Sequence, residues 1–357
     1  MPKETNEMKY DRGIIDYLKF FTLFLEDGKL VIDSEFDYPY QIGLIDHKVR
    51  EITQSKRPLF MTTRSRHGRG WKAARLGGDL QNCLRTFSDV IPGYYNKNKF
   101  GPYFTLFMRY VDRLRLADEA LRYRGDVTSI NTLIEEMRNE AHQSDFQSYY
   151  AKVDRSARKN SQSLNEYLRA LFNMYSKLLV VRIDLGYDRR LTPSLGREIS
   201  PIDVIRDREK FLRHLRRKYP SLAGYIWKLE YGLAKSYHIH FLILFDGHKV
   251  RNDVAIGNLL GEHWRTNITR GIGMYWNCNG TKKRYARLGT LGIGAVGYDD
   301  KELRKNLVNA ASYLAKSDYY VRLKEPNLGN TFGKGLMPKK PSSRKGRRRE
   351  CEKQGKL

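Results

Sequence analysis

The chain has 357 residues, with 66 Lys and Arg against 40 Asp and Glu, and its formal net charge of +26 predicts a polyanionic partner, nucleic acid first of all. Hydrophobic residues make up 40% of a chain long enough to bury its own core, which excludes a disordered polymer. The three cysteines, Cys83, Cys278 and Cys351, are far apart, which excludes a disulfide framework and a cysteine zinc finger and fits a reducing compartment.

Membrane insertion is not expected either. The first residues lack the apolar core of a signal peptide, and no run approaches the roughly 20 apolar residues that span a bilayer. We therefore expect a soluble intracellular protein.

The first 175 residues predict a mainly helical, basic accessory region, and the sequence does not indicate its role. Residues 14–25 favour a buried helix, although the most apolar part, 18–25, also fits a strand. Residues 30–32 favour a short strand. From residue 102 to residue 177, apolar side chains recur at helical intervals.

Residues 62–76 form a strongly basic stretch with one embedded tryptophan, Trp71. The pattern predicts a loop or the start of a helix. Two interpretations remain open. Either the cations contact phosphates and Trp71 stacks on a base, or the stretch is a solvated arginine-rich loop.

The pattern changes at residue 178, where short apolar, β-branched runs alternate with amphipathic helices. Pro201 and Asp203 mark the beginning of one helix, and its Lys/Arg-rich last turn marks the end. The alternation predicts an α+β domain over residues 176–335, with an antiparallel-dominated central sheet flanked by helices. The expected strands are 178–185, 225–231, 237–245, 273–278 and 290–298, and the expected helices are 201–218, 252–268 and 300–318.

The last segment, residues 336–357, is basic, polar and almost free of apolar residues. This composition predicts a disordered tail. The tail either holds nucleic acid non-specifically or only keeps the protein solvated.

The segment from Glu230 to Phe245 carries the candidate metal ligands. His238 and His240 are two apart on a predicted strand, so both imidazoles project from the same face. Glu230 lies across a short hairpin turn on the preceding strand and can add a carboxylate oxygen. Two nitrogens and one oxygen can hold a divalent cation and leave coordination positions for a substrate oxygen. The alternative is a pair of half-exposed histidines on an edge strand.

A candidate nucleophile lies downstream, in the predicted helix of residues 300–318. Tyr313 and Lys316 are three apart and share a helix face. A phenol has an unperturbed pKa of about 10, and a nearby ammonium group and a metal ion favour the phenolate. The alternative is that Tyr313 is a core aromatic and Lys316 is unrelated to it.

Four segments follow one another along the second half of the chain: 181–187 (VRIDLGY), 227–232 (WKLEYG), 238–247 (HIHFLILFDG) and 313–318 (YLAKSD). Together they resemble the HUH endonucleases, and specifically the rolling-circle replication initiators of the inovirus gene-two-protein family, which is related to the YagK/YfjJ C-terminal domain of prophages. The resemblance implies a palm-like sheet. It does not extend over the first half of the chain.

The resemblance also implies a metal-dependent, site-specific nickase and strand transferase that starts replication on phage, prophage or plasmid DNA in a bacterial cytoplasm. His238, His240 and Glu230 would hold Mg²⁺ or Mn²⁺. Tyr313 would attack the scissile phosphate and stay joined to the 5′ end, and the freed 3′-hydroxyl would prime replication before the strand is rejoined. Lys316 would position the phosphate or the tyrosine.

Some initiators place a second catalytic tyrosine one helical turn after the first, but this sequence has Ser317 there. We therefore expect a single-tyrosine mechanism, with Tyr319 and Tyr320 as the other candidates for a second tyrosine. Asp184, on a strand expected beside the metal strand, either assists the site or is a structural carboxylate. The expected partner is single-stranded origin DNA, with a host helicase and DNA polymerase as further candidates and no small-molecule cofactor.

Two other functions remain open. A relaxase or single-strand transposase belongs to the same superfamily, but relaxases usually place the tyrosine before the histidines, and small transposases are much shorter. A non-catalytic DNA-binding origin protein or repressor would keep the positive charge and need no metal. The presence of the full set of candidate site residues counts against that second alternative.

Overall fold

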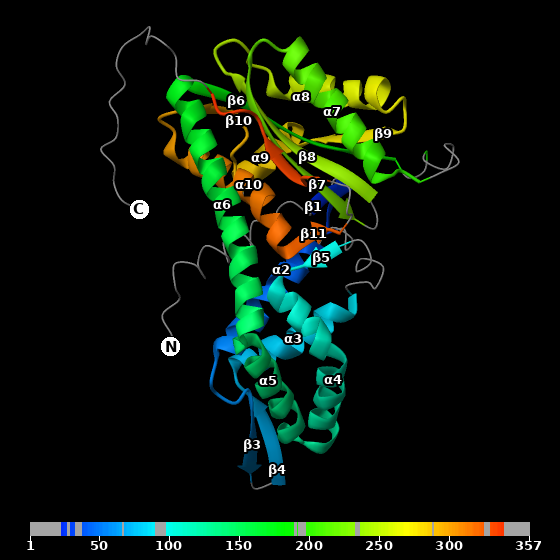
Figure 1. Ribbon diagram of the computed structural model, residues 1–357, viewed down its shortest axis with the longest axis vertical. Coiled ribbons are helices and arrows are strands. Elements are labelled where there is room, and N and C mark those ends of the chain that lie inside the picture. The colour runs from blue at the N-terminus through cyan, green and yellow to red at the C-terminus, as the bar shows by residue number, and fades with distance from the viewer. Residues whose placement is uncertain are drawn as a thin grey trace.

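The computed structural model describes most of the chain, and its arrangement is shown in Figure 1. A central sheet with its helices occupies the upper part of that view, and a helical assembly occupies the lower part. The described residues are 23–26, 29–32, 38–65, 68–89, 98–188, 191, 198–232, 236–287, 289–324 and 329–338.

The strands β1 (Leu23–Glu26) and β2 (Lys29–Ile32) form an antiparallel pair in which Leu25 lies opposite Leu30. The strand expected at residues 30–32 is confirmed. Of the helix and the strand left open for the apolar run 18–25, the strand is confirmed for residues 23–25 and the helix is wrong there. Residues 14–22 lie outside the described residues. A short apolar run does not by itself distinguish a helix from a strand, and here pairing with a neighbour decides.

The lower assembly consists of amphipathic helices that bury their apolar faces against one another. The chain turns sharply between two of them, where Gly125 adopts a φ of 65° and the carboxylate of Asp126 accepts the backbone N–H of Thr128. The expected helical stretch 102–177 is confirmed as helices that end at Met174. The helices are α2 (Tyr38–Gln54), α3 (Arg75–Asp89), α4 (Pro102–Arg124), α5 (Val127–His142) and α6 (Ser144–Met174).

The strands β3 (Phe60–Ser65) and β4 (Gly68–Ala73) pair as an antiparallel hairpin that extends from the lower end of the molecule (Figure 1). The expectation of a loop or a helix start over residues 62–76 is therefore wrong for residues 62–65 and 68–73, while residues 66–67 lie outside the described part of the chain. Helix α3 begins only at Arg75. Cations and threonines on both faces of the hairpin hide the alternation of apolar and polar residues that marks most strands.

The central sheet of the described chain is antiparallel throughout, and its strand order is β10-β6-β8-β7-β12. Strand β9 also pairs with β6. The α+β class, helix 201–218 and the strands expected at 178–185, 225–231 and 237–245 are confirmed. The strand expected at 273–278 ends at Asn277, and the strand expected over 290–298 is confirmed only for 294–297. The strands are β6 (Lys177–Tyr187), β7 (Leu222–Gly232), β8 (Ser236–Asp246), β9 (Gly273–Asn277), β10 (Gly294–Gly297) and β12 (Phe332–Lys334).

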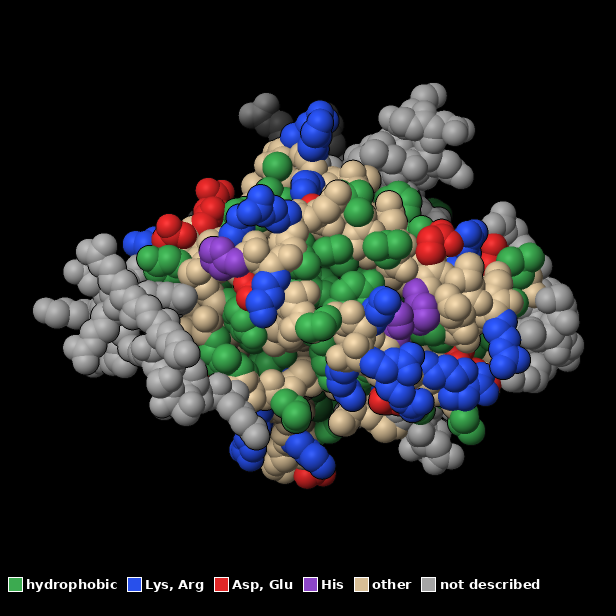
Figure 2. All heavy atoms as spheres, turned by 90° about the horizontal axis from the view of Figure 1, so that it is seen from above, with side chains coloured by type: hydrophobic (Ala, Val, Ile, Leu, Met, Phe, Trp, Pro, Cys, Tyr) green, Lys and Arg blue, Asp and Glu red, His purple; other side chains and the backbone are tan. Residues whose placement is uncertain are grey.

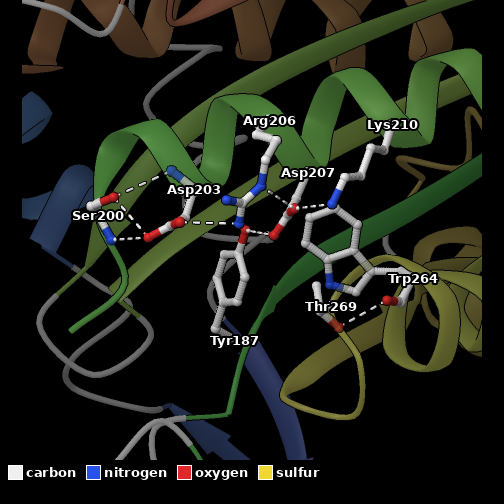
Figure 3. Close-up of polar contacts among 8 residues, drawn as sticks. All are labelled: Tyr187, Ser200, Asp203, Arg206, Asp207, Lys210, Trp264 and Thr269. Atoms are coloured by element: carbon white, nitrogen blue, oxygen red, sulfur yellow. Dashed lines mark hydrogen bonds and ion pairs between the residues drawn. The ribbon is translucent and has the colours of Figure 1, made fainter. Parts of the chain in front are cut away.

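One face of the sheet packs against α7 (Pro201–Lys218), α8 (Asp253–His263) and the π-helical turn Trp264–Ile268. Ser200 and Asp203 cap each other's backbone N–H groups at the beginning of α7, and Asp207 accepts the Tyr187 hydroxyl at 3.2 Å (Figure 3). Burial and Asp207 raise the pKa of Tyr187. This buried hydrogen bond fixes α7 on the sheet.

The other face packs against α6 and α10 (Lys301–Tyr320), and the small pair β5 (Asn98–Phe100) and β11 (Val321–Leu323) follows the end of α10. Helix α6 has 31 residues, so it is about 46 Å long and runs from the lower assembly to the sheet (Figure 1). A connected core of buried apolar residues therefore continues from the helices into this face of the sheet.

The C-terminal half of α7 forms a basic surface. Figure 2 shows Lys and Arg side chains gathered beside histidines on the end of the molecule seen from above. The rings of His214 in α7 and His263 in α8 stack with their centroids 3.5 Å apart. Burial and the neighbouring His263 lower the pKa of His214 to about 4. None of the described helices has the length and apolar character needed to cross a membrane.

Candidate metal centre

The candidate metal ligands come from two adjacent strands of the central sheet. In the register of the hairpin, Glu230 of β7 lies directly opposite His238 of β8. His240 is two residues further along β8, so its side chain projects from the same face. Residues opposite each other in an antiparallel pair are only about 5 Å apart, which is why a local hairpin can assemble this cluster.

The three side chains converge on one point. The Oε2 atom of Glu230 lies 3.3 Å from Nε2 of His240 and 3.7 Å from Nε2 of His238. One ligand atom from each residue lies within 4.8 Å of the other two. Two atoms that each lie about 2.1 Å from a cation, at a right angle, are about 3 Å apart, so these separations fit a shared divalent ion.

Each imidazole is held from behind by a second contact. The Nδ1 atom of His240 lies 2.7 Å from Oδ1 of Asp184, its neighbour on β6. The Nδ1–H of His238 donates to the backbone carbonyl of Ser236 at 3.1 Å. With both Nδ1 atoms engaged, both Nε2 atoms face Glu230. Metal-binding histidines in proteins are oriented in this way by carboxylates and carbonyls.

The electrostatics of the cluster also favour a cation. Burial alone would lower the pKa of His240, but the carboxylates of Asp184 and Glu230 outweigh it and raise this pKa to about 9. Burial opposes ionisation of Glu230, but His240 and His238 hold the pKa of this carboxyl well below its usual range. The carboxylates thus retain a positive charge between them, and a divalent cation would compete with the proton for that position.

Asp184 is part of the cluster. Its carboxylate contacts His240, and Nε of Arg182 lies 3.8 Å from the same oxygen. Sγ of Cys278 lies 3.9 Å from the other oxygen. Of the two roles left open for Asp184, the geometry supports that of orienting His240.

Tyr313 and Tyr320 lie on α10, the helix that covers this face of the sheet. Both are buried, each with 3% of its surface exposed, and they belong to the core that includes Val180 and Leu242. The side chains of Lys316 and Tyr319 lie outside the described part of the structure. The structure therefore brings together Glu230, His238, His240 and Asp184, and it places Tyr313 on the helix above the same face.

Two buried cations near the site were missed in the sequence. Lys228 lies opposite His240 in the register of β7 and β8 and is only 1% exposed, and Arg182 is 3% exposed. The alternation of side chains along a strand, which grouped the two histidines, could also have identified these two cations. Lys228 is two residues before Glu230, and Arg182 is two residues before Asp184, so each shares a face with its partner.

A partly exposed aromatic side chain borders the site. Trp276 of β9 lies opposite Asp184 of β6, so its side chain projects from the face that carries the ligands. It is 39% exposed. A partly exposed indole beside a metal centre can stack on an unpaired base.

These features define an antiparallel α+β domain with a two-histidine, one-carboxylate site of the kind that binds a divalent metal ion. The chain belongs to the YagK/YfjJ C-terminal domain family, whose model matches residues 139–335, more than half of its length. That range contains every strand of the central sheet and all the candidate site residues. No curated protein and no solved structure gives a significant match.

Proposed function

We propose that the protein is a replication initiator of the HUH type, resembling the inovirus gene-two-protein family, that nicks single-stranded DNA at an origin and later rejoins it. The observation that carries this proposal is the convergence of both histidine Nε2 atoms on the Glu230 carboxylate, with each ring oriented from behind. The net charge of +26 supports a polyanionic substrate.

A bound Mg²⁺ or Mn²⁺ would polarise the scissile phosphate and stabilise the charge that develops on it. Tyr313 is the proposed nucleophile: its hydroxyl gives up a proton, and its oxygen bonds to phosphorus. The bond from phosphorus to the 3′ oxygen breaks, and that oxygen takes up a proton to become a free 3′-hydroxyl. The reverse reaction closes the strand, because the phosphotyrosine bond retains the energy of the bond that was broken.

Residues around the ligands would hold the strand. Lys228 supplies a buried positive charge beside His240, which fits a phosphate, and Lys316 is proposed to position the phosphate or Tyr313. Trp276 is proposed to stack on a base next to the scissile bond. A host helicase and polymerase are the further partners proposed, in a bacterial cytoplasm.

A non-catalytic DNA-binding origin protein or repressor is the second candidate, and one observation favours it: Tyr313 is only 3% exposed. A phenol that DNA never reaches would be a core aromatic. A relaxase or single-strand transposase would use the same metal centre and form the same 5′-phosphotyrosine bond. The position of Tyr313 after the histidines and the length of the chain count against these two classes.

The deciding experiment uses a pool of labelled single-stranded DNA with a randomised centre, incubated with the full-length protein and Mn²⁺. We expect a covalent protein–DNA adduct that survives denaturation, is lost in Tyr313→Phe and is retained in Tyr320→Phe, a matched change on the same helix. Peptide mass spectrometry should place the 5′ phosphate on Tyr313. DNA binding without any adduct would support the non-catalytic candidate instead.

A further inference from the structure

The hairpin of β3 and β4 is a second candidate nucleic-acid contact, far from the metal centre in the fold. It lies at the end of the molecule opposite the central sheet (Figure 1). The sequence around it, residues 52–78, contains no Asp or Glu. The proposed reaction at the metal centre does not use it.

The base of the hairpin is fixed to the helical assembly. Both backbone groups of Phe60 bind the side chain of Asn131 in α5, with the N–H donating at 3.3 Å and the carbonyl accepting at 2.8 Å. Trp71 packs edge-on against Phe60, with ring centroids 6.1 Å apart. Trp71 therefore packs at the base of the hairpin and against the core. Base stacking by Trp71 was one of the two interpretations that the sequence left open for this stretch.

Beyond this base the hairpin carries exposed positive charge. Arg64 lies directly opposite Arg69, and Lys72 is exposed on the other face of the ribbon. None of these three side chains pairs with an acidic group among the described residues, whereas Arg75, just past the hairpin, pairs with Asp79 at 3.2 Å. Like charges directly opposite each other destabilise a hairpin, so this pair is favourable only when an anion lies against it.

The shape of the hairpin fits a groove of duplex DNA. Six paired residues per strand give a ribbon about 20 Å long. The major groove of B-form DNA is about 12 Å wide and admits a two-stranded ribbon. Gly68 and Gly70 alternate on one face of β4, which lets the backbone approach another surface closely.

We propose that the β3–β4 hairpin is a DNA-binding arm that enters the major groove of duplex DNA, with Arg64, Arg69 and Lys72 contacting the backbone phosphates or base edges. That the ligand is DNA rests on the proposed function. The anchoring of the hairpin, and the lack of an acidic partner for its three cations among the described residues, are independent of that function. The arm would hold the duplex while the metal centre acts on the single strand, which gives the helical region a role.

The test measures fluorescence anisotropy of the full-length protein with a 20-base-pair DNA duplex over a range of salt concentrations. The arm variant is Arg64→Gln/Arg69→Gln/Lys72→Gln. The control variant, Lys152→Gln/Arg155→Gln/Lys159→Gln, removes the same charge from exposed positions on α6. Thermal melting of both variants verifies that they fold.

We expect the arm variant to lose at least about tenfold in duplex affinity, and the slope of log affinity against log salt to become shallower by about 0.9 per lost contact. The control variant should lose far less. An arm variant that binds the duplex as tightly as the control does would overturn the proposal.

Duplex RNA of the same sequence separates groove insertion from plain charge attraction, because the deep, narrow major groove of A-form RNA does not admit the ribbon. An equal loss of affinity for RNA and DNA in the arm variant would also overturn the proposal. Nicking of a short single strand should be unchanged in the arm variant. If the wild-type protein nicks nothing, the proposed function fails, while the duplex binding measurement still decides on the arm.

Discussion

The two faces of the central sheet are built from alternate residues of the same strands and differ in kind. On β6, the face under α7 and α8 is apolar along the whole strand, from Leu179 to Tyr187. The face under α6 and α10 begins with Leu178 and Val180 and then changes to Arg182 and Asp184.

Burial of an unpaired polar or charged group costs several kcal/mol of stability. We therefore expect such groups inside a sheet mainly where they have a function. The change from apolar to charged residues occurs at the same level on β6, β8 and β7, because Asp184, His240 and Lys228 lie in one row across the sheet. The face under α7 and α8 thus stabilises the fold, while part of the face under α6 and α10 carries the charged cluster. The following predictions test that separation.

The largest expected effect is on catalysis. Replacing His240 with Ala removes one metal ligand, and we expect nicking to fall by at least about 10³-fold, because metal stabilisation of the transition state is worth several kcal/mol. Affinity for single-stranded DNA, measured over a salt series, should remain nearly unchanged, because it comes from Lys and Arg contacts with phosphates. Equal loss of binding and nicking would contradict the separation of roles.

For the next residue, Phe241, we expect the opposite: a substitution lowers stability and leaves metal binding unchanged. Phe241 points to the apolar face, is fully buried and packs against Phe211 with ring centroids 4.9 Å apart. We expect Phe241→Ala to lower the free energy of unfolding by about 3–5 kcal/mol in a urea titration. The folded protein should bind Mn²⁺ as the wild type does, and weakened metal binding would show that the two faces are coupled.

Asp184→Asn tests the contact behind His240. Loss of such an orienting carboxylate typically costs about 10- to 100-fold in metal affinity, and we expect a loss in that range for Mn²⁺ by calorimetry. Saturating Mn²⁺ should restore most of the nicking rate. Asp207→Asn, a buried carboxylate on the other side of the sheet, is the matched control, and an equal effect there would refute a specific role for Asp184.

Trp276→Ala should weaken single-strand binding by about tenfold, within the roughly 1–3 kcal/mol that one stacked base contributes. Trp276→Phe should recover most of the affinity. Met274→Ala, at a similarly exposed position on the same face of β9, serves as the control. If both alanine variants bind equally, Trp276 does not stack on the strand.

The smallest effect concerns pH. The pKa of His214 is lowered to about 4 in the folded protein, below its unfolded value of about 6.5. The unfolded chain therefore binds more protons between these values, and stability present at pH 7 is lost as the pH falls through this window. We expect the melting temperature of His214→Gln to fall less from pH 7 to pH 5 than that of the wild type or of His248→Gln, an exposed histidine. Parallel curves would contradict this.

How much of the fold the sequence predicts depends on how local its signals are. Helix α7 was predicted to the residue, because Pro201 and the Asp203 cap mark its beginning. The β3–β4 hairpin was not, because its two faces carry similar polar residues and the alternation is hidden. The pairing of β9 with β6 joins residues about 90 apart, and nothing local records it.

The candidate site divides in the same way. Glu230, His238 and His240 come together through one hairpin, so spacing along the sequence was enough to group them. The contact of Asp184 with His240 depends on a strand more than 50 residues away, and its role stayed open until the register was known. Whether Tyr313 reaches a bound strand depends on how α10 lies against the sheet when DNA is present, which spacing does not encode.

The central claim is that two imidazoles and one carboxylate share a metal ion, and pulsed electron paramagnetic resonance of the Mn²⁺-loaded protein tests it directly. We expect modulation from imidazole ¹⁴N nuclei of two coordinated histidines, reduced to one in His238→Ala and weakened together with Mn²⁺ affinity in Glu230→Gln. A spectrum of Mn²⁺ surrounded only by water and carboxylate oxygens, unchanged in these variants, would contradict the claim.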